Sequence, residues 1–357
     1  MYNQCGGLAQ GDTSAKAACV LELSTGRVLF EHDMHARLPM ASTTKVMTAL
    51  LAIERGDLSA SVTCSKNAFG VPGTSIYLAE GETLTLEEML LGLMLSSGND
   101  AAVAIAEHIG GSVSQFAGMM NERAAEIGAV NTHFSNPHGL PDDTHFTTAY
   151  DLALIASEAM QNDTFRRIVS TQRASIPWEG RSYGRQLQNK NRLLSDYPGA
   201  TGIKTGFTSR AGRCLVFGAK RGGMEVVGVV LGCSDWFDEA QRLMDGCFET
   251  YTMTRMLGPL ESAGHIAVVG GKREQAGMCL MGELCVPLAE GESAQVVLDV
   301  PEQVSAPVYP GMHLGTARLV AGGKVYGECE VVASERVDSK HLTMDIYRVL
   351  SRWILGG

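Results

Sequence analysis

The stretch AACVLELSTGRVLFE, residues 17–31, places two apolar runs on either side of the turn Ser24-Thr25-Gly26. Two such runs around a glycine-containing turn predict a β-hairpin. Residues 213–219 and 224–231 form a second pair of strand-like runs, across the turn Arg221-Gly222-Gly223. Helical patterns fill the residues between these pairs. Strands at both ends with helices between them predict that distant strands meet in one sheet, in an α/β or α+β layered fold.

Several intervening segments carry helix signals. Beyond residue 45 apolar residues recur at the i, i+3, i+4, i+7 spacing of a helix face, namely Val46, Ala49, Leu50 and Ile53. Thr85 with Glu88, and Ser112 with Gln115, have the spacing of capping boxes and predict helix starts, the second for a helix at 115–127. Two more helices are predicted at residues 148–161 and 236–253.

Length and composition restrict the class of protein. The 357 residues suggest two domains at about 150 residues each. Asp and Glu number 39 against 29 Lys and Arg, a net charge of -10, which argues against a nucleic-acid partner. The chain lacks a run of the roughly 20 apolar residues that span a bilayer. Its first eleven residues are polar, without the basic start and apolar run of an export signal. The nine cysteines include no Cys-x-x-Cys pair, and we expect neither a metal nor another cofactor.

The pattern changes near residue 260. Short alternating segments separated by Gly and Pro predict a small all-β domain, with Gly322-Gly323 closing one hairpin. We expect a first domain at 12–258, the β-rich domain at 262–335 and an amphipathic helix at 340–357. That helix places Trp353 among apolar residues on one face, which suits either a membrane surface or docking on protein.

Ser42 and Lys45 carry the first chemical signal. Ser42 opens the first predicted helix, where the positive end of the helix dipole favours negative charge on its oxygen. Lys45 lies one turn later on the same face, within reach of that hydroxyl. The spacing suits a nucleophile and its base, although a serine N-cap beside an ordinary helix lysine would look the same.

Two further short motifs follow in the chain. Ser97-Gly98-Asn99 joins two apolar helices and offers a hydroxyl and an amide, although a plain turn and cap would also use such residues. Lys204-Thr205-Gly206 precedes a strand-like run, and its glycine lets a substrate backbone approach closely, although a surface strand could hold the same residues. The three motifs in this order arise by chance about once in a hundred sequences, which favours a shared site.

A Ser-x-x-Lys, Ser-Asp-Asn, Lys-Thr-Gly set belongs to penicillin-binding proteins and class A β-lactamases. This chain has Gly98 where the lactamases carry Asp. It closely resembles the low-molecular-mass penicillin-binding proteins that act as serine-type D-alanyl-D-alanine carboxypeptidases. The resemblance covers about residues 15–255 strongly and the remainder loosely. The stretches that carry it are ASTTKVMTA (41–49), LSSGNDAA (95–102), NPHGLPD (136–142) and GIKTGFT (202–208).

The resemblance implies a β-lactamase/transpeptidase-like domain with an antiparallel sheet and helices, followed by the small all-β domain. It implies that the enzyme removes the terminal D-Ala of peptidoglycan stem peptides through an acyl-enzyme on Ser42, and that β-lactams acylate the same oxygen. It places the enzyme outside the cytoplasmic membrane. Lys45 would be the base and Ser97 would relay a proton.

The same resemblance implies the substrate contacts. Asn99 would hold the substrate amide, and Thr205 with a cation would hold its terminal carboxylate. Lys204, together with partial burial, would lower the pKa of Lys45. Lys204 and Gly206 are also expected among the substrate-binding residues. The backbone N–H groups of Ser42 and Phe207 would receive the oxyanion.

Two further roles and two other functions remain open. Relatives often use an Arg to hold the carboxylate, and Arg213 or Arg242 could replace it here. His138 could assist deacylation or be a loop histidine bonded to backbone. A β-lactamase would need a carboxylate to activate water, and the Glu158-x-x-x-Asn162 spacing offers Glu158 for that role. A non-catalytic muropeptide or penicillin sensor is the other alternative.

Overall fold

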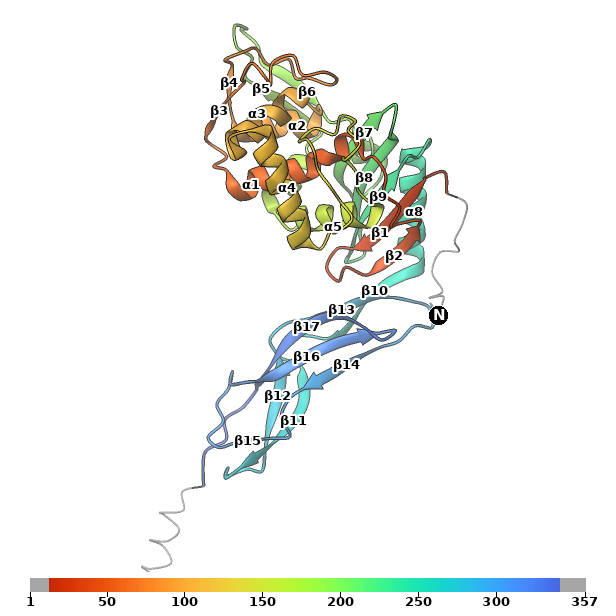
Figure 1. Ribbon diagram of the computed structural model, residues 1–357. Coiled ribbons are helices and arrows are strands. Elements are labelled where there is room, and N and C mark those ends of the chain that lie inside the picture. The colour runs from red at the N-terminus through yellow and green to blue at the C-terminus, as the bar shows by residue number, and fades with distance from the viewer. Residues whose placement is uncertain (1–12, 341–357) are drawn as a thin grey trace, which may run out of the picture. The chain divides into compact units, whose positions relative to one another are not determined.

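This computed structural model describes residues 13–340, which divide into two compact units between Thr252 and Met253 (Figure 1). Helices and an antiparallel sheet build the first unit, and strands alone build the described part of the second after β10 (Tyr251–Leu257). The expected fold class, an antiparallel sheet with helices followed by a small all-β unit, is confirmed.

The first unit is organised around a five-stranded sheet with the order β2-β1-β9-β8-β7. All four pairings are antiparallel. Distant strands meet as predicted, because β1 from the start of the chain pairs with β9. The strands are β1 (Ala17–Glu22), β2 (Val28–His32), β7 (Ala200–Thr208), β8 (Gly212–Arg221) and β9 (Met224–Leu231).

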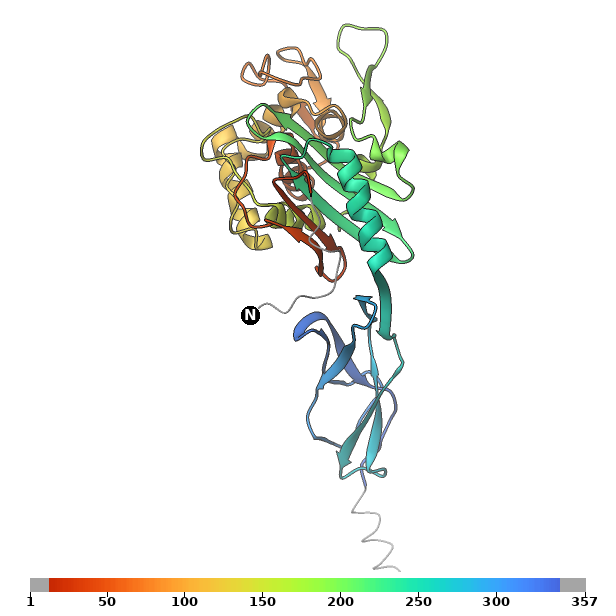
Figure 2. The same cartoon turned by 90° about the vertical axis from the view of Figure 1, so that its right-hand side faces the viewer.

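Helices cover both faces of this sheet. Figure 2 shows α8 (Trp236–Thr250) across one face of the sheet. On the opposite face, α5 (Ala149–Ala159) packs against β1 and β9, on the same side as the other helices. Every residue of β9 is buried, because both of its faces are covered. A strand covered on both faces is uniformly apolar instead of alternating. Accordingly residues 226–231 of β9 form a continuous apolar run, while its buried Glu225 forms an ion pair with Arg166.

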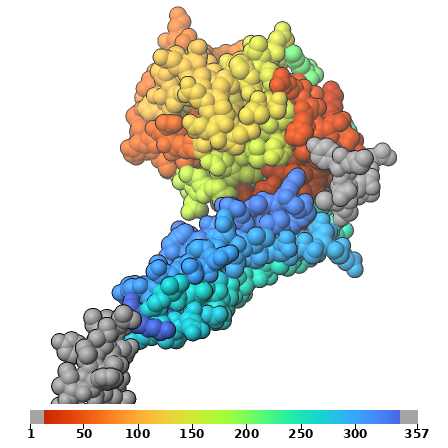
Figure 3. Space-filling view, turned by 60° about the horizontal axis from the view of Figure 1, so that its bottom comes forward, coloured from red at the N-terminus to blue at the C-terminus, as the bar shows by residue number. Residues whose placement is uncertain are grey.

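The helical layer centres on α1 (Lys45–Arg55), which continues directly from the short 3-10 turn η1 (Ala41–Thr44). Around it lie α2 (Leu86–Leu95), α3 (Asn99–Gly110), α4 (Val113–Ile127) and α6 (Asp163–Ser170), while α7 (Leu193–Asp196) packs against β7. Figure 3 shows α4 on the outer surface, and accordingly it buries only one stripe of residues. Two small hairpins complete the unit: β3 (Ser61–Thr63) with β4 (Thr83–Thr85), and β5 (Arg173–Ile176) with β6 (Arg185–Gln188).

Local expectations are mostly confirmed, with three corrections. The Thr85–Glu88 capping box is present. At α4 only one of the two capping-box hydrogen bonds is present. The Ser112 hydroxyl accepts from the backbone N–H of Gln115, but the Gln115 side chain bonds the Ser112 hydroxyl and not its backbone N–H. The helix predicted to reach residue 253 ends at Thr250, where alternating β-prone residues form β10. Residues 200–208 form the edge strand β7, which the glycines in the sequence concealed.

The second unit holds a six-stranded sheet, β14-β16-β17-β12-β11-β15, and a two-stranded sheet of β10 with β13. Gly322 and Gly323 close the β16–β17 hairpin as predicted, both with positive φ. The strands are β11 (Ser262–Val269), β12 (Gln275–Leu280), β13 (Leu284–Ala289), β14 (Ala294–Asp299), β15 (Gln303–Ser305), β16 (His313–Ala321) and β17 (Lys324–Ala333).

Among residues 13–340, no helix has the length and apolar character needed to cross a membrane. The amphipathic helix predicted at 340–357 lies, apart from its first residue, outside the described residues.

Candidate active site

Ser42 and Lys45 meet at the junction of η1 and α1. The Lys45 ammonium nitrogen lies 3.1 Å from the Ser42 hydroxyl oxygen. The predicted contact across one helical turn is therefore present. Lys45 is completely buried, although it is the first residue of α1. A buried amine one hydrogen bond from a serine hydroxyl is suited to removing its proton.

Two other groups hold Lys45 in place. Its amine donates to Oδ1 of Asn99 at 2.7 Å and to the backbone carbonyl of His138 at 2.8 Å. Asn99 is the first residue of α3, and His138 comes from the loop before α5. Three segments distant in sequence thus converge on one nitrogen. The motifs placed Asn99 in the shared site as a contact for the substrate amide, so its bond to Lys45 is an addition from the structure. No pattern in the sequence signals a role for the His138 carbonyl.

The electrostatic surroundings of Lys45 disfavour its charged form. Burial lowers the pKa of Lys45 well below its ordinary value, and the positive charges of Lys204 and Lys190 lower it further, against a smaller opposing effect of Asp100. Burial also lowers the pKa of Lys204 to about 7, with Lys190 as the second cause. Desolvation and like charges both penalise an ammonium group. Both effects therefore favour the neutral amine of Lys45 over the ammonium form.

The edge strand β7 presents Lys204, Thr205 and Gly206 to the Ser42 turn. A Cβ atom placed on Gly206 would lie 3.0 Å from the backbone nitrogens of both Ser42 and Thr43. The backbone of β7 therefore runs directly against the start of the catalytic helix, and a side chain would push the two apart. Lys204 is 1% exposed and donates to the carbonyl of Thr205 at 3.0 Å, while the side chain of Phe207 is largely exposed.

Ser97 lies in the tight turn between α2 and α3. It is 4% exposed and has a φ of 64°, in the left-handed region that non-glycine residues rarely adopt. Next to it, Nδ2 of Asn99 donates to the carbonyl of Pro72 at 2.6 Å. Both polar atoms of the Asn99 side chain thus have partners within the protein. For the expected contact with the substrate, Asn99 therefore has only the second N–H of its Nδ2 group left.

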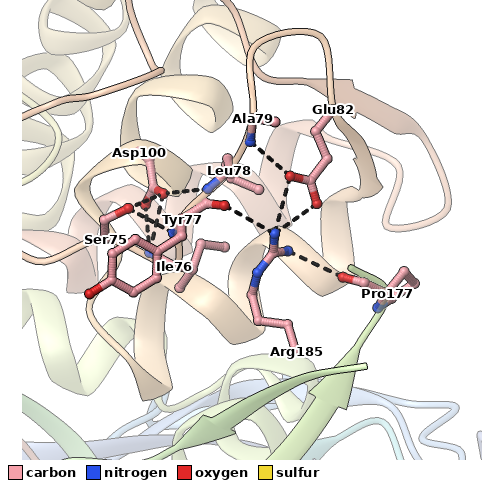
Figure 4. A network of polar contacts seen from close by, with 9 residues as sticks. All are labelled: Ser75, Ile76, Tyr77, Leu78, Ala79, Glu82, Asp100, Pro177 and Arg185. Carbon is pink, nitrogen blue, oxygen red and sulfur yellow. Dashed lines mark hydrogen bonds and ion pairs between the residues drawn. The ribbon is translucent and has the colours of Figure 1, made fainter. Parts of the chain in front are cut away.

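The loop that meets Asn99 is anchored by a buried polar network (Figure 4). The Asp100 carboxylate accepts from the Ser75 hydroxyl and from the backbone N–H groups of Ile76 and Leu78. Further along the loop, Arg185 and Glu82 form an ion pair at 2.8 Å in which both side chains are almost fully buried. No sequence pattern signals this anchoring, because its partners are far apart in the chain.

The candidate carboxylate-holding arginines occupy different surroundings. Arg213 is exposed on β8, paired in register with Phe207, and donates to the carbonyl of Ser234 at 2.6 Å. Arg242 forms an ion pair with Glu239 on α8. Arg213 therefore lies on the strand next to β7, while Arg242 is already engaged with a carboxylate.

The imidazole of His138 is mostly buried and accepts a hydrogen bond from the N–H of Leu140 at 3.2 Å. Burial, and next the charge of Lys45, lower the pKa of His138 to about 3. The ring is accordingly neutral over the working pH range.

Glu158 and Asn162, the residues required by the β-lactamase alternative, have other partners. Glu158 forms an ion pair with Arg123, which also binds Glu54, and the side chain of Asn162 caps α6. Within residues 13–340 neither side chain hydrogen-bonds to Ser42. The spacing that suggested this alternative reflects helix packing and capping.

Most cysteines of the described residues lie in the interior. Six of the described cysteines are buried, where they behave as small apolar residues. Over residues 13–340 no cluster of His, Cys, Asp or Glu is arranged to hold a metal ion.

The fold and the site together define an active-serine enzyme of the Ser-x-x-Lys class, with its nucleophile between an antiparallel sheet and a helical layer. Residues 6–235 match the family described as D-alanyl-D-alanine carboxypeptidase, Peptidase S11. The chain is 33% identical to the D-alanyl-D-alanine carboxypeptidase DacF of Bacillus subtilis, over 95% of this chain and 90% of that protein.

Solved structures agree with this match. A mutant of the Streptomyces K15 DD-transpeptidase is 34% identical with a TM-score of 0.63, covering 67% of this chain and all of that one. Penicillin binding protein 5 of Haemophilus influenzae shares the fold at 24% identity, with a TM-score of 0.77 over 93% of this chain and 100% of that chain.

The chain belongs to the serine-type D-alanyl-D-alanine carboxypeptidase family. Peptidoglycan substrates, β-lactam binding and action outside the cytoplasm fit this family.

Proposed function

We propose that Ser42 attacks the carbonyl between the two terminal D-alanines of a peptidoglycan stem peptide. Lys45 accepts the hydroxyl proton as the new Oγ–C bond forms. The C–N bond then breaks, D-Ala leaves with a proton on its amine, and water hydrolyses the ester. The observation that carries this proposal is the 3.1 Å contact between the Ser42 hydroxyl and a fully buried lysine whose pKa is lowered.

The oxyanion of this reaction is received by the backbone N–H groups of Ser42 and Phe207. Support comes from Gly206, whose missing side chain allows β7 to approach the Ser42 nitrogen closely. Each such donor contributes about 3 kcal/mol to transition-state stabilisation.

The remaining motif residues divide between proton transfer and substrate binding. Ser97 relays the proton to the leaving amine, and Asn99 orients Lys45 through Oδ1 while its second N–H meets the substrate. Lys204 and Thr205 hold the terminal carboxylate, assisted by Arg213 on the neighbouring strand. His138 contributes its backbone carbonyl to Lys45.

The partners follow from this chemistry. Stem peptides ending in D-Ala-D-Ala are the substrates, and β-lactams acylate Ser42 and leave slowly. The enzyme acts outside the cytoplasmic membrane, where these peptides are. Catalysis resides in the unit that ends at Thr252.

The decisive test measures free D-Ala after incubation with a tripeptide ending in D-Ala-D-Ala, with and without penicillin. We expect release that penicillin blocks, and Ser42→Ala should abolish both release and penicillin labelling while the variant remains folded. Labelling retained by Ser42→Ala would exclude Ser42 as the nucleophile. Rapid nitrocefin turnover would instead indicate a β-lactamase, and a wild-type chain that penicillin never labels would indicate a sensor.

We also propose that residues 340–357 attach the enzyme to a membrane surface. The apolar face that includes Trp353, opposite a face with arginines, supports this. The full chain should sediment with vesicles containing anionic lipid, and Trp353→Glu should weaken this. Equal sedimentation of both proteins would contradict the proposal.

A further inference from the structure

His145 is a buried histidine outside the three motifs, and it lies against the Ser42 turn. Its side chain contacts Thr44, the second of the two residues between Ser42 and Lys45 in the motif: His145 Nε2 is 2.8 Å from Thr44 Oγ1. Its other ring nitrogen, Nδ1, is 3.0 Å from the backbone nitrogen of Ser135. The imidazole is 4% exposed and packs edge-on against Phe134.

These contacts fix the direction of a chain of hydrogen bonds. A backbone N–H can only donate, so Nδ1 of His145 accepts from Ser135, and the neutral ring carries its proton on Nε2. Nε2–H therefore donates to Thr44 Oγ1. The Thr44 hydroxyl proton is then directed to the carbonyl of Ala41, at 2.8 Å.

The carbonyl at the end of this chain belongs to an unusual backbone. Ala41 has a φ of 50°, in the left-handed region that non-glycine residues rarely adopt, and it directly precedes Ser42. Residues held in this region persist only when the surroundings determine them, and they concentrate at functional sites. Gly139 packs on the same carbonyl so tightly that a Cβ there would lie 1.8 Å from the Ala41 oxygen.

The orientation of the Ala41–Ser42 peptide matters for the chemistry. Its carbonyl accepts from Thr44, and its N–H is the Ser42 donor that faces β7. Rotation of this one peptide plane would move the N–H away from the oxyanion and shift the Ser42 hydroxyl from Lys45.

We propose that His145 is a positioning residue for acylation, acting through the Thr44 hydroxyl to hold the Ala41–Ser42 peptide in its productive orientation. This inference rests on the proposed function of Ser42. Burial lowers the pKa of His145 to about 4, which keeps the imidazole in the neutral form that the hydrogen-bond chain requires.

The test compares acylation by a fluorescent penicillin with melting temperature in isosteric variants. Thr44→Val removes the hydroxyl and should slow acylation at least tenfold. The matched control is Thr48→Val, one turn further along α1, whose buried hydroxyl donates to the carbonyl of Pro137 at 2.6 Å. Thr48→Val should lower the melting temperature by a similar amount and leave the acylation rate within twofold.

Two substitutions at His145 test the hydrogen bonds of its two ring nitrogens separately. An Asn amide reaches the Nδ1 position and a Gln amide the Nε2 position, so only His145→Gln can still donate to Thr44. We expect His145→Asn to slow acylation as much as Thr44→Val, His145→Gln to recover most of the rate, and the Thr44→Val/His145→Asn double variant to be no slower than either single variant.

The outcomes distinguish this inference from the proposed function. If penicillin fails to acylate the wild-type chain, the proposed function fails. If the wild type is acylated and Thr44→Val keeps its rate, the positioning role of His145 is wrong. A loss in Thr48→Val as large as that in Thr44→Val would also overturn it, because general loosening of α1 would then explain both. Thr44→Val decides the matter if His145→Asn does not fold.

Discussion

Replacing Lys204 with Met should make the protein more stable and less active. Burial lowers the pKa of Lys204 from its ordinary 10.5 to about 7, with the charge of Lys190 as the second cause. A tenfold change in proton affinity is about 1.4 kcal/mol, so this lysine costs the folded state about 4 kcal/mol at pH 7. Met removes that cost but leaves the Thr205 carbonyl without its donor, a loss of about 1–2 kcal/mol. The net gain at pH 7 is about 2 kcal/mol.

The gain should depend on pH in a defined direction. The unfolded chain keeps the Lys204 proton up to about pH 10.5, whereas the folded protein releases it near pH 7. Between these values the unfolded state binds more protons, so the stability of the wild type rises with pH. At pH 9.5 the cost of Lys204 has fallen to about 1 kcal/mol, and the advantage of Lys204→Met should have disappeared.

Activity should change in the opposite sense. Among neighbouring charges, that of Lys204 lowers the pKa of Lys45 most. Replacing Lys204 with Met should therefore raise the pKa of Lys45. The acid limb of the pH profile for penicillin acylation should therefore move to higher pH. Loss of the cation in the site should also lower the acylation rate by about a hundredfold.

Urea unfolding at pH 7 and 9.5, and stopped-flow acylation across the same range, would measure both effects. Lys66→Met, at an exposed lysine, is the control for loss of a charge alone. A Lys204→Met protein that is less stable than the wild type at pH 7, or whose advantage grows with pH, would refute the electrostatic argument. So would an acid limb that does not move.

Gly206→Ala should slow acylation at least tenfold with a small change in melting temperature, because the new Cβ would lie 3.0 Å from the Ser42 nitrogen; an unchanged rate would show that β7 can move away freely. Arg185→Met should lower the free energy of unfolding by about 3–5 kcal/mol, since it leaves the buried Glu82 unpaired. In urea unfolding, the double variant Arg185→Met/Glu82→Gln should recover part of that loss. Arg213→Gln should raise KM for peptides with a free terminal carboxylate more than for the same peptides amidated; equal changes would separate Arg213 from the carboxylate.

The fold class was predictable because hydrophobic periodicity is a local property. The hairpin at residues 17–31, the helix after Lys45 and the all-β pattern beyond residue 260 each carry their signal in consecutive residues. Strand β7 was considered only as an alternative for Lys204-Thr205-Gly206, because its glycines, which allow close approach to Ser42, also weaken the strand pattern. The end of α8 was misplaced because pairing with β13, a distant segment, decides where β10 begins.

By itself, the sequence determined the chemical groups of the site and their order. The Ser42–Lys45 contact follows from one turn of helix, and the three motifs indicate a shared site by their co-occurrence. How those groups behave depends on the packing of segments that are distant in the chain. Burial and neighbouring charges lower the pKa of Lys45, the carbonyl of His138 holds its amine, and His145 and Gly139 support the backbone before Ser42. These effects depend on which atoms surround a group in space, and that depends on residues separated by many positions in the chain.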